Sequence, residues 1–145
     1  MSDAARITDS DYQQNLLSGL QLFQDVCPDA VATLMQQCER VDIAKGQVLL
    51  SPGETNDSVY IVLSGRLNVH VGSTDAPILA SMEVGACVGE MSILEDGDPS
   101  AFVIAPEPTH LLVIHQAVLW ELVNASHDFC KNLLIVLSER VRSHN

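Results

Sequence analysis

The order of apolar and polar positions divides the chain into three parts. Residues 9–22 begin polar and continue with leucines at helical spacing, and Pro28 with Asp29 begins a second helical segment that runs to residue 37. After Glu39 the helical spacing gives way to short apolar runs separated by turn residues. From residue 116 the helical spacing returns. The pattern therefore predicts helices, then strands, then helices.

The middle part predicts β-strands at 41–44, 48–50, 59–63, 67–71, 78–84, 102–105 and 111–114. Asn68 and His70 alternate with apolar neighbours, which indicates a strand with one solvated face. Residues 59–63 are apolar throughout, which indicates a strand covered on both faces. Seven or eight short strands at this spacing predict an antiparallel sandwich or jelly roll.

The last part predicts a short helix at 116–123 and a longer one capped by Ser126. Asp128 complements the N-terminal end of the longer helix dipole, and Arg140 and Arg142 complement its C-terminal end. Its apolar side chains cover a wide face: Phe129, Leu133, Leu134, Val136, Leu137 and Val141. Either this whole face packs on the roll, or part of it is a seam for self-association.

Composition fits one domain over 1–145, with N-terminal helices at 1–38, a β-roll at 39–115 and C-terminal helices at 116–145. The chain has 145 residues, of which 47% are hydrophobic. Its formal net charge of −12 argues against nucleic acid or an anionic membrane as partner. No Lys or Arg occurs from Leu67 through Cys130. An anion bound in that stretch must therefore rely on backbone amides and helix ends.

Targeting and metal signals are lacking in the sequence. The first residues have neither the basic nor the apolar region of a signal peptide, and no apolar run approaches the ~18 residues of a membrane span. The four cysteines show no zinc or iron–sulfur spacing, and those flanking the second helix, Cys27 and Cys38, are too far apart for a disulfide. We expect a cytoplasmic chain without a metal site.

Residues 85–101, GACVGEMSILEDGDPSA, resemble the phosphate-binding cassette of cyclic-nucleotide-binding domains. In that cassette a Gly-Glu pair opens a short helix, and an Arg-Ser/Thr/Ala-Ala triplet closes the following loop. Gly89-Glu90-Met91-Ser92 matches the opening, and Ser100-Ala101 matches the end. The arginine position falls on Pro99 if the loop is counted without a gap, and otherwise in a one-residue deletion before Ser100. In both countings the arginine is absent.

The resemblance extends over about 22–142. Lys45-Gly46-Gln47 and Ser51-Pro52-Gly53-Glu54 resemble the first hairpin and turn of the family, and 59–65 resembles its Tyr/Phe-rich strand with the following glycine. The resemblance implies an antiparallel β-roll, or double-stranded β-helix, with N-terminal helices and two C-terminal helices. It also implies a non-enzymatic regulatory module like the effector domain of Crp-like proteins or of kinase regulatory subunits.

The resemblance implies a site of Gly89, Glu90, Met91, Ser92, Ser100 and Ala101, with cAMP or cGMP as ligand. Glu90 would accept from the ribose 2′-hydroxyl, and backbone amides near the other residues would hold the phosphate. A charge-assisted hydrogen bond contributes about 1.5–3 kcal/mol, so the lost arginine predicts a roughly ten- to few-hundred-fold weaker affinity. Of the other cations, Arg66 is one that could reach in from elsewhere in the fold.

Two further functions stay open at this point. A degenerate domain would act through protein contacts, with an effector protein or as a homodimer through its last helix; Gly85 and Gly89 would then serve turns, and Glu90 would cap amides. Alternatively, the pocket would sense another small ligand or haem, although His110 and His115 point to opposite faces of one strand. In the family the base packs on the last helix, which makes 132–136 candidate lid contacts. No catalytic motif is present, Cys87 has no basic neighbour, and DNA binding by this chain is not expected.

Overall fold

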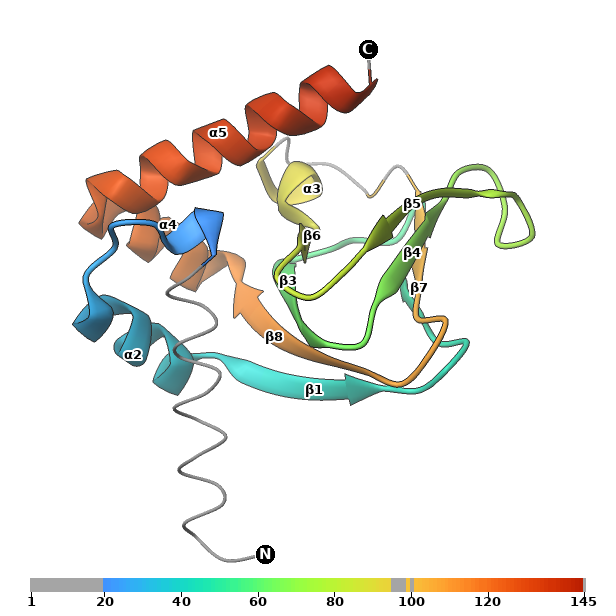
Figure 1. Cartoon of the computed structure of the whole chain (residues 1–145), viewed down its shortest axis with the longest axis horizontal. Coiled ribbons are helices and arrows are strands. Elements are labelled where there is room, and N and C mark those ends of the chain that lie inside the picture. Colours follow the sequence, from blue (N-terminus) through green and yellow to red (C-terminus); the bar gives the residue numbers. More distant parts are fainter. Residues whose placement is uncertain (1–19, 95–98, 100, 145) are drawn as a thin grey trace, which may run out of the picture. The chain divides into compact units, whose positions relative to one another are not determined.

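The computed structural model describes residues 20–94, 99 and 101–144 (Figure 1). The chain forms two compact units. The roll unit is Cys38–Gln116, and the helical unit combines Met1–Gln37 with Ala117–Asn145. The roll unit contains the residues that resemble the cassette.

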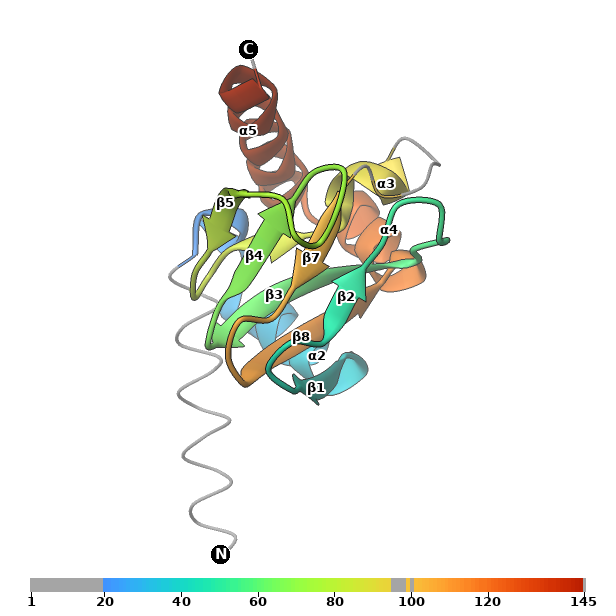
Figure 2. The same cartoon turned by 90° about the vertical axis from the view of Figure 1, so that its right-hand side faces the viewer.

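The roll unit consists of two four-stranded antiparallel sheets. The first has the order β1 (Glu39–Ile43), β8 (Thr109–His115), β3 (Ser58–Ser64) and β6 (Cys87–Val88). The second, which faces the viewer in Figure 2, has the order β2 (Val48–Leu50), β7 (Phe102–Ile104), β4 (Leu67–His70) and β5 (Ile78–Met82). The predicted antiparallel β-roll is confirmed.

The strands agree with the apolar runs of the sequence to within one or two residues at most ends. Strand β6 was not predicted, because only two residues pair with β3 between two glycines. Strand β3 is buried on both faces, since Val59, Ile61 and Val62 are no more than 1% exposed. This confirms the prediction that β3 is covered on both sides. Side chains of both sheets meet in one core: Ile43, Leu50, Val62, Leu67, Val88, Val103, Ala105 and Leu111.

One end of the roll is closed around Thr109 and is called here the Thr109 end. Gly65, in the β3–β4 turn, has φ +84, and a Cβ there would lie 2.6 Å from the Pro108 carbonyl oxygen. The Thr109 hydroxyl accepts from the Arg66 amide at 3.1 Å, and its oxygen lies 2.9 Å from each of two acceptors, the carbonyl oxygens of Arg66 and Glu107. A buried hydroxyl thus fixes the turn to the start of β8.

The helical unit contains a 3₁₀ turn η1 (Gln21–Phe23) and helices α2 (Pro28–Gln37), α4 (Gln116–Ala125) and α5 (His127–His144). Helix α2 has the predicted bounds, whereas most of the helix predicted at 9–22 lies outside the described residues. Ser126 accepts from the Phe129 amide at 3.1 Å, which confirms it as the N-cap of α5. None of the described helices is long and apolar enough to span a membrane.

Asn132 joins α5 to η1. Its side chain is 7% exposed, and its Nδ2 donates to the carbonyls of Leu22 at 3.0 Å and Gln24 at 2.8 Å. Beside it the rings of Phe23 and Phe129 lie 5.6 Å apart. The amide of Asn132 is therefore engaged in the packing of the helical unit, and the predicted lid role of 132–136 stays a prediction.

We expect Asn132→Ala to lower the free energy of unfolding by about 1–3 kcal/mol, because the substitution removes the donor to two carbonyls. Asn132→Asp should lower it further, since a carboxylate would face the same two carbonyl oxygens. Thermal and urea unfolding measure both effects, with Asn124→Ala on the exposed side of α4 as control. Equal stability of wild type and Asn132→Asp would contradict this role.

Candidate functional site

The candidate cassette begins where β6 ends. Cys87 and Val88 pair with Ile61 and Tyr60, and Gly89 then turns the chain with φ +95 into the short helix α3 (Glu90–Leu94). A Cβ on Gly89 would lie 2.6 Å from the Ser58 carbonyl oxygen and 2.9 Å from Asn56 Nδ2. A residue with a side chain is therefore excluded both by the backbone conformation and by the close approach. This agrees with the predicted Gly-Glu opening of a helix.

Asn56, in the loop before β3, contacts the cassette through its carboxamide. Its Nδ2 lies within hydrogen-bond distance of the Ser92 hydroxyl (2.9 Å), the Gly89 carbonyl (3.2 Å) and the Ser58 carbonyl (2.9 Å). The Ser92 hydroxyl in turn donates to the Gly89 carbonyl at 3.0 Å. The side chain of Ser92 is thus used inside the protein, which leaves only its backbone amide as a candidate ligand contact.

Glu90 is the first residue of α3, and its side chain is completely buried. Burying a carboxylate is costly unless polar groups surround it. A buried Glu90 therefore needs hydrogen-bond partners in addition to apolar contacts. The location matches the expected ribose acceptor, and that role stays a prediction.

The predicted site residues lie in two segments, 89–92 and 99–101. Gly89, Glu90, Met91 and Ser92 lie together in one turn, and Pro99 and Ala101 are half-buried just before β7. Ser100 lies outside the described residues.

The three cations of the roll unit all lie away from the cassette. Gly89 approaches β3 at Ser58, whereas Arg66 follows the other end of this strand, Ser64, about 20 Å away at 3.3 Å per residue. Arg66 is also at the opposite end of β4 from the strand pair His70–Phe102, next to which Ala101 lies. Arg66 therefore does not replace the missing arginine, which corrects the expectation that it could reach in.

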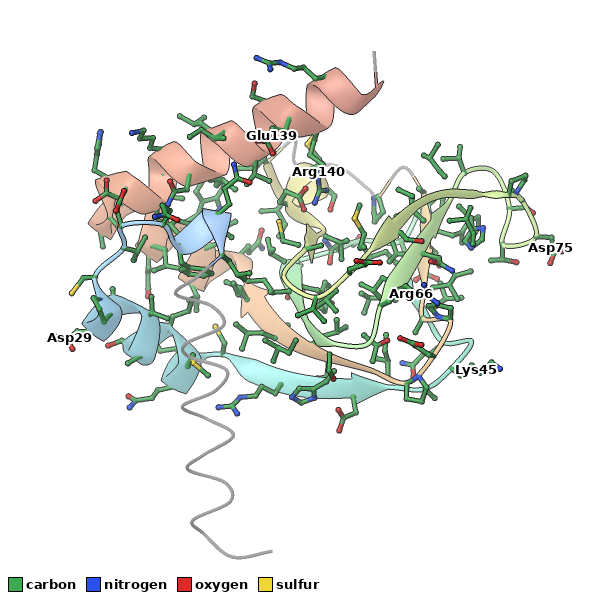
Figure 3. The ribbon with its side chains drawn as sticks, in the orientation of Figure 1. Asp29, Lys45, Arg66, Asp75, Glu139 and Arg140 are labelled. Carbon is green, nitrogen blue, oxygen red and sulfur yellow. The ribbon has the colours of Figure 1, made fainter. Side chains whose placement is uncertain are left out.

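Lys45 and Arg40 also lie away from the cassette. Lys45 lies in the β1–β2 turn, whose Gly46 amide donates to the Ala105 carbonyl near the Thr109 end, and Figure 3 shows it far from α3. Arg40 lies on the edge strand β1, three strand spacings or about 14 Å from Cys87 in the same sheet. An anion at the cassette would thus meet backbone donors and no cation of the roll unit.

Asp57, next to Asn56, contacts the last residue of β8 and the residue that follows it, both within the roll unit. Its carbonyl accepts from the Gln116 amide at 2.8 Å, and its carboxylate accepts from the Ser58 hydroxyl at 2.9 Å and lies 3.5 Å from His115 Nε2. The loop 56–58 therefore contacts two segments far apart in sequence.

Burial raises the pKa of Tyr60 above its ordinary value of 10.0, and the negative charge of Asp57 raises it further.

The three histidines of the roll unit have separate partners. His70 Nδ1 lies 2.7 Å from the Ala76 carbonyl, His110 Nδ1 lies 2.5 Å from the Asp42 carboxylate, and His115 lies near Asp57. Among the residues that the structure describes, no group of three or more His, Cys, Asp or Glu could hold a metal ion.

The cysteines are all free thiols. Burial raises the pKa of Cys38 from 9.0 to about 11, so its thiolate is scarce at neutral pH.

Neither Asn56 nor Asp57 was predicted from the sequence as a site residue. Asn56 is 33 positions from Gly89 and 36 from Ser92, so no local pattern links it to the cassette. The available signal was weak: two short polar residues follow a glycine turn and precede an apolar strand, which also describes many ordinary loops.

A sequence profile of the cyclic nucleotide-binding domain family matches residues 40–126. The chain therefore belongs to the cyclic nucleotide-binding domain family. This range covers most of the roll, with α3 and the cassette, and continues through α4.

Named relatives agree with this family. The "Cyclic AMP receptor protein" of Thermus thermophilus is 28% identical over 129 residues, which are 87% of this chain and 59% of that protein. The "CRP-like cAMP-activated global transcriptional regulator" of Mycobacterium tuberculosis is 26% identical over 132 residues, or 90% of this chain and 59% of the relative. The crystal structure of the Thermus thermophilus catabolite activator protein superposes with a TM-score of 0.77 at 26% identity, covering 86% of this chain and 59% of that one. The chain thus spans 59% of the length of these relatives.

We expect Asp57→Asn to lower the pKa of Tyr60, because the substitution removes the negative charge that disfavours the tyrosinate and leaves the burial unchanged. The pKa should remain above 10.0, since burial is the larger cause. A pH titration of tyrosinate absorbance measures the change, and Tyr60→Phe separates its signal from that of Tyr12. Asp42→Asn, an exposed carboxylate on β1, is the control; an unchanged Tyr60 pKa in Asp57→Asn would contradict the assignment.

Proposed function

We propose that this chain is a non-enzymatic regulatory module that binds cAMP or cGMP at residues 89–92 and 99–101, with weak affinity. The observation that carries the proposal is the opening of the cassette. In a member of this family, Gly89 makes the close approach to Ser58, and the fully buried Glu90 follows at the start of α3. Glu90 is assigned as the ribose acceptor, and the amides of Met91, Ser92, Ser100 and Ala101 as phosphate donors.

Weak affinity follows from the charges. Pro99 stands at or beside the position where the family has its arginine, and Arg40, Lys45 and Arg66 lie elsewhere in the roll unit. Neutral amides remain as donors, and each contributes less than a guanidinium to an anion. The net charge of −12 opposes an anionic ligand further and gives no support to DNA binding by this chain. The four free thiols fit a reducing, cytoplasmic location.

Calorimetry with cAMP and cGMP tests the proposal directly. We expect heat of binding at millimolar nucleotide in the wild type and a roughly ten- to few-hundred-fold tighter affinity in Pro99→Arg, because the new guanidinium would pair with the phosphate. Pro99→Gln is the matched control, since it removes the proline without adding charge. Absence of heat and of a thermal shift with both nucleotides, in wild type and Pro99→Arg alike, would refute nucleotide binding.

We also propose that the chain forms a homodimer through α5. Leu134 is 63% and Ile135 39% exposed, so two large apolar side chains are adjacent on the solvent-exposed side of this helix. They belong to a groove along α5 lined by His127, Cys130, Lys131, Leu134, Ile135, Ser138, Glu139 and Arg142. The wide apolar face predicted for this helix thus extends beyond the buried side chains Phe129 and Leu133.

We expect Leu134→Glu to weaken the dimer by on the order of tenfold or more, because burying a leucine side chain contributes about 1.5–3 kcal/mol. Sedimentation equilibrium or light scattering over a concentration series measures the effect. Val48→Glu, at an exposed apolar position on β2, is the control and should leave the dimer unchanged. A wild type that is monomeric at high concentration would overturn the proposal.

A further inference from the structure

The carbonyl of Gly89 is the point where three donors converge. The Ile93 amide lies 3.4 Å from it, the Ser92 hydroxyl 3.0 Å and Asn56 Nδ2 3.2 Å. Two of these donors belong to α3 itself, whereas Asn56 comes from the loop before β3. Asn56 is therefore a side-chain link between the first turn of α3 and the segment that leads into β3.

The orientation of the Asn56 carboxamide is determined by its partners. Its Oδ1 accepts from the Ser58 amide at 3.2 Å, while its Nδ2 faces the Ser58 carbonyl and the Ser92 hydroxyl, both at 2.9 Å. The reversed orientation would place an oxygen against two carbonyl oxygens, those of Ser58 and Gly89. One side chain thus supplies both an acceptor and donors that no shorter or charged residue would supply together.

Helix α3 needs such an external contact. It has five residues, and so short a helix is not stable by itself in water. The preceding residue, Gly89, has no side chain to restrict its backbone. The direction in which the first amides of α3 point is therefore fixed by contacts to the rest of the roll.

We propose that Asn56 is a positioning residue of the cassette: its carboxamide holds the Gly89 carbonyl and the Ser92 hydroxyl, and thereby aligns Glu90 and the α3 amides for the nucleotide. Asn56 does not itself touch the ligand. The part of this inference that concerns affinity rests on the proposed nucleotide binding, whereas the part that concerns the orientation of α3 does not.

Asn56→Ala removes all of these contacts, and Thr109→Val is its matched control. Thr109 is also a buried polar residue that fixes a turn to the sheet, but it lies at the opposite end of β3. We expect Asn56→Ala to increase amide hydrogen exchange in peptides covering 89–94 and to weaken cAMP binding about tenfold. Thr109→Val should lower the melting temperature with unchanged cAMP affinity and unchanged exchange in 89–94.

Ser92→Ala and the double variant Asn56→Ala/Ser92→Ala test whether the two side chains act together. If they form one network, the double variant should weaken cAMP binding by about as much as Asn56→Ala alone. Asn56→Asp keeps the size and the acceptor but loses the donor, so it should resemble Asn56→Ala in both measurements.

Two outcomes would overturn the proposal. Unchanged exchange in 89–94 in Asn56→Ala would show that this side chain does not hold α3. Increased exchange with a wild-type cAMP affinity would show that the hold has no effect on the ligand. Absence of cAMP and cGMP binding in the wild type would instead refute the proposed function and the affinity half of this inference, while the exchange comparison still decides the structural half.

Discussion

Strand β3 is the constraint on which the roll depends. It is buried on both faces and pairs with β8 along one edge and with β6 along the other. Its Ser58 end receives the cassette through the approach of Gly89, and its Ser64 end leads into the turn held by Thr109. A one-residue slip of β3 would reverse every side chain and remove both contacts at once, so its register fixes where the cassette lies.

The described start of the cassette combines neutral hydrogen-bonding groups with one buried carboxyl group, that of Glu90. Backbone carbonyls, one carboxamide and one hydroxyl fix the start of α3, and Glu90 is the first residue of this helix. Such a network is strong only when each donor has its acceptor, which makes it directional and sensitive to single substitutions. Recognition of a ligand here would therefore depend more on geometry than on attraction between opposite charges.

The sequence predicted what local patterns encode. The apolar run at 59–63, the bounds of α2 and the Ser126 cap follow from periodicity and from capping preferences, and the structure confirms them. Contacts across long sequence separations were not predictable: the two-residue strand β6 exists only through pairing with β3, and Asn56 gains its partners only when the roll closes. The remoteness of Arg66 likewise depends on the register between β4 and β7. The ligand roles of Glu90, Ser100 and Ala101 rest on family resemblance and remain predictions.

The separation of Lys45 and Arg66 from the cassette has a consequence for how salt acts on the protein. Where an arginine pairs with a phosphate, dissolved ions screen the attraction and weaken binding. In this chain the cations of the roll lie away from the cassette, and the overall charge is −12. Screening would then reduce repulsion between protein and anion, so that rising ionic strength would favour occupancy of the cassette and speed the approach of the ligand.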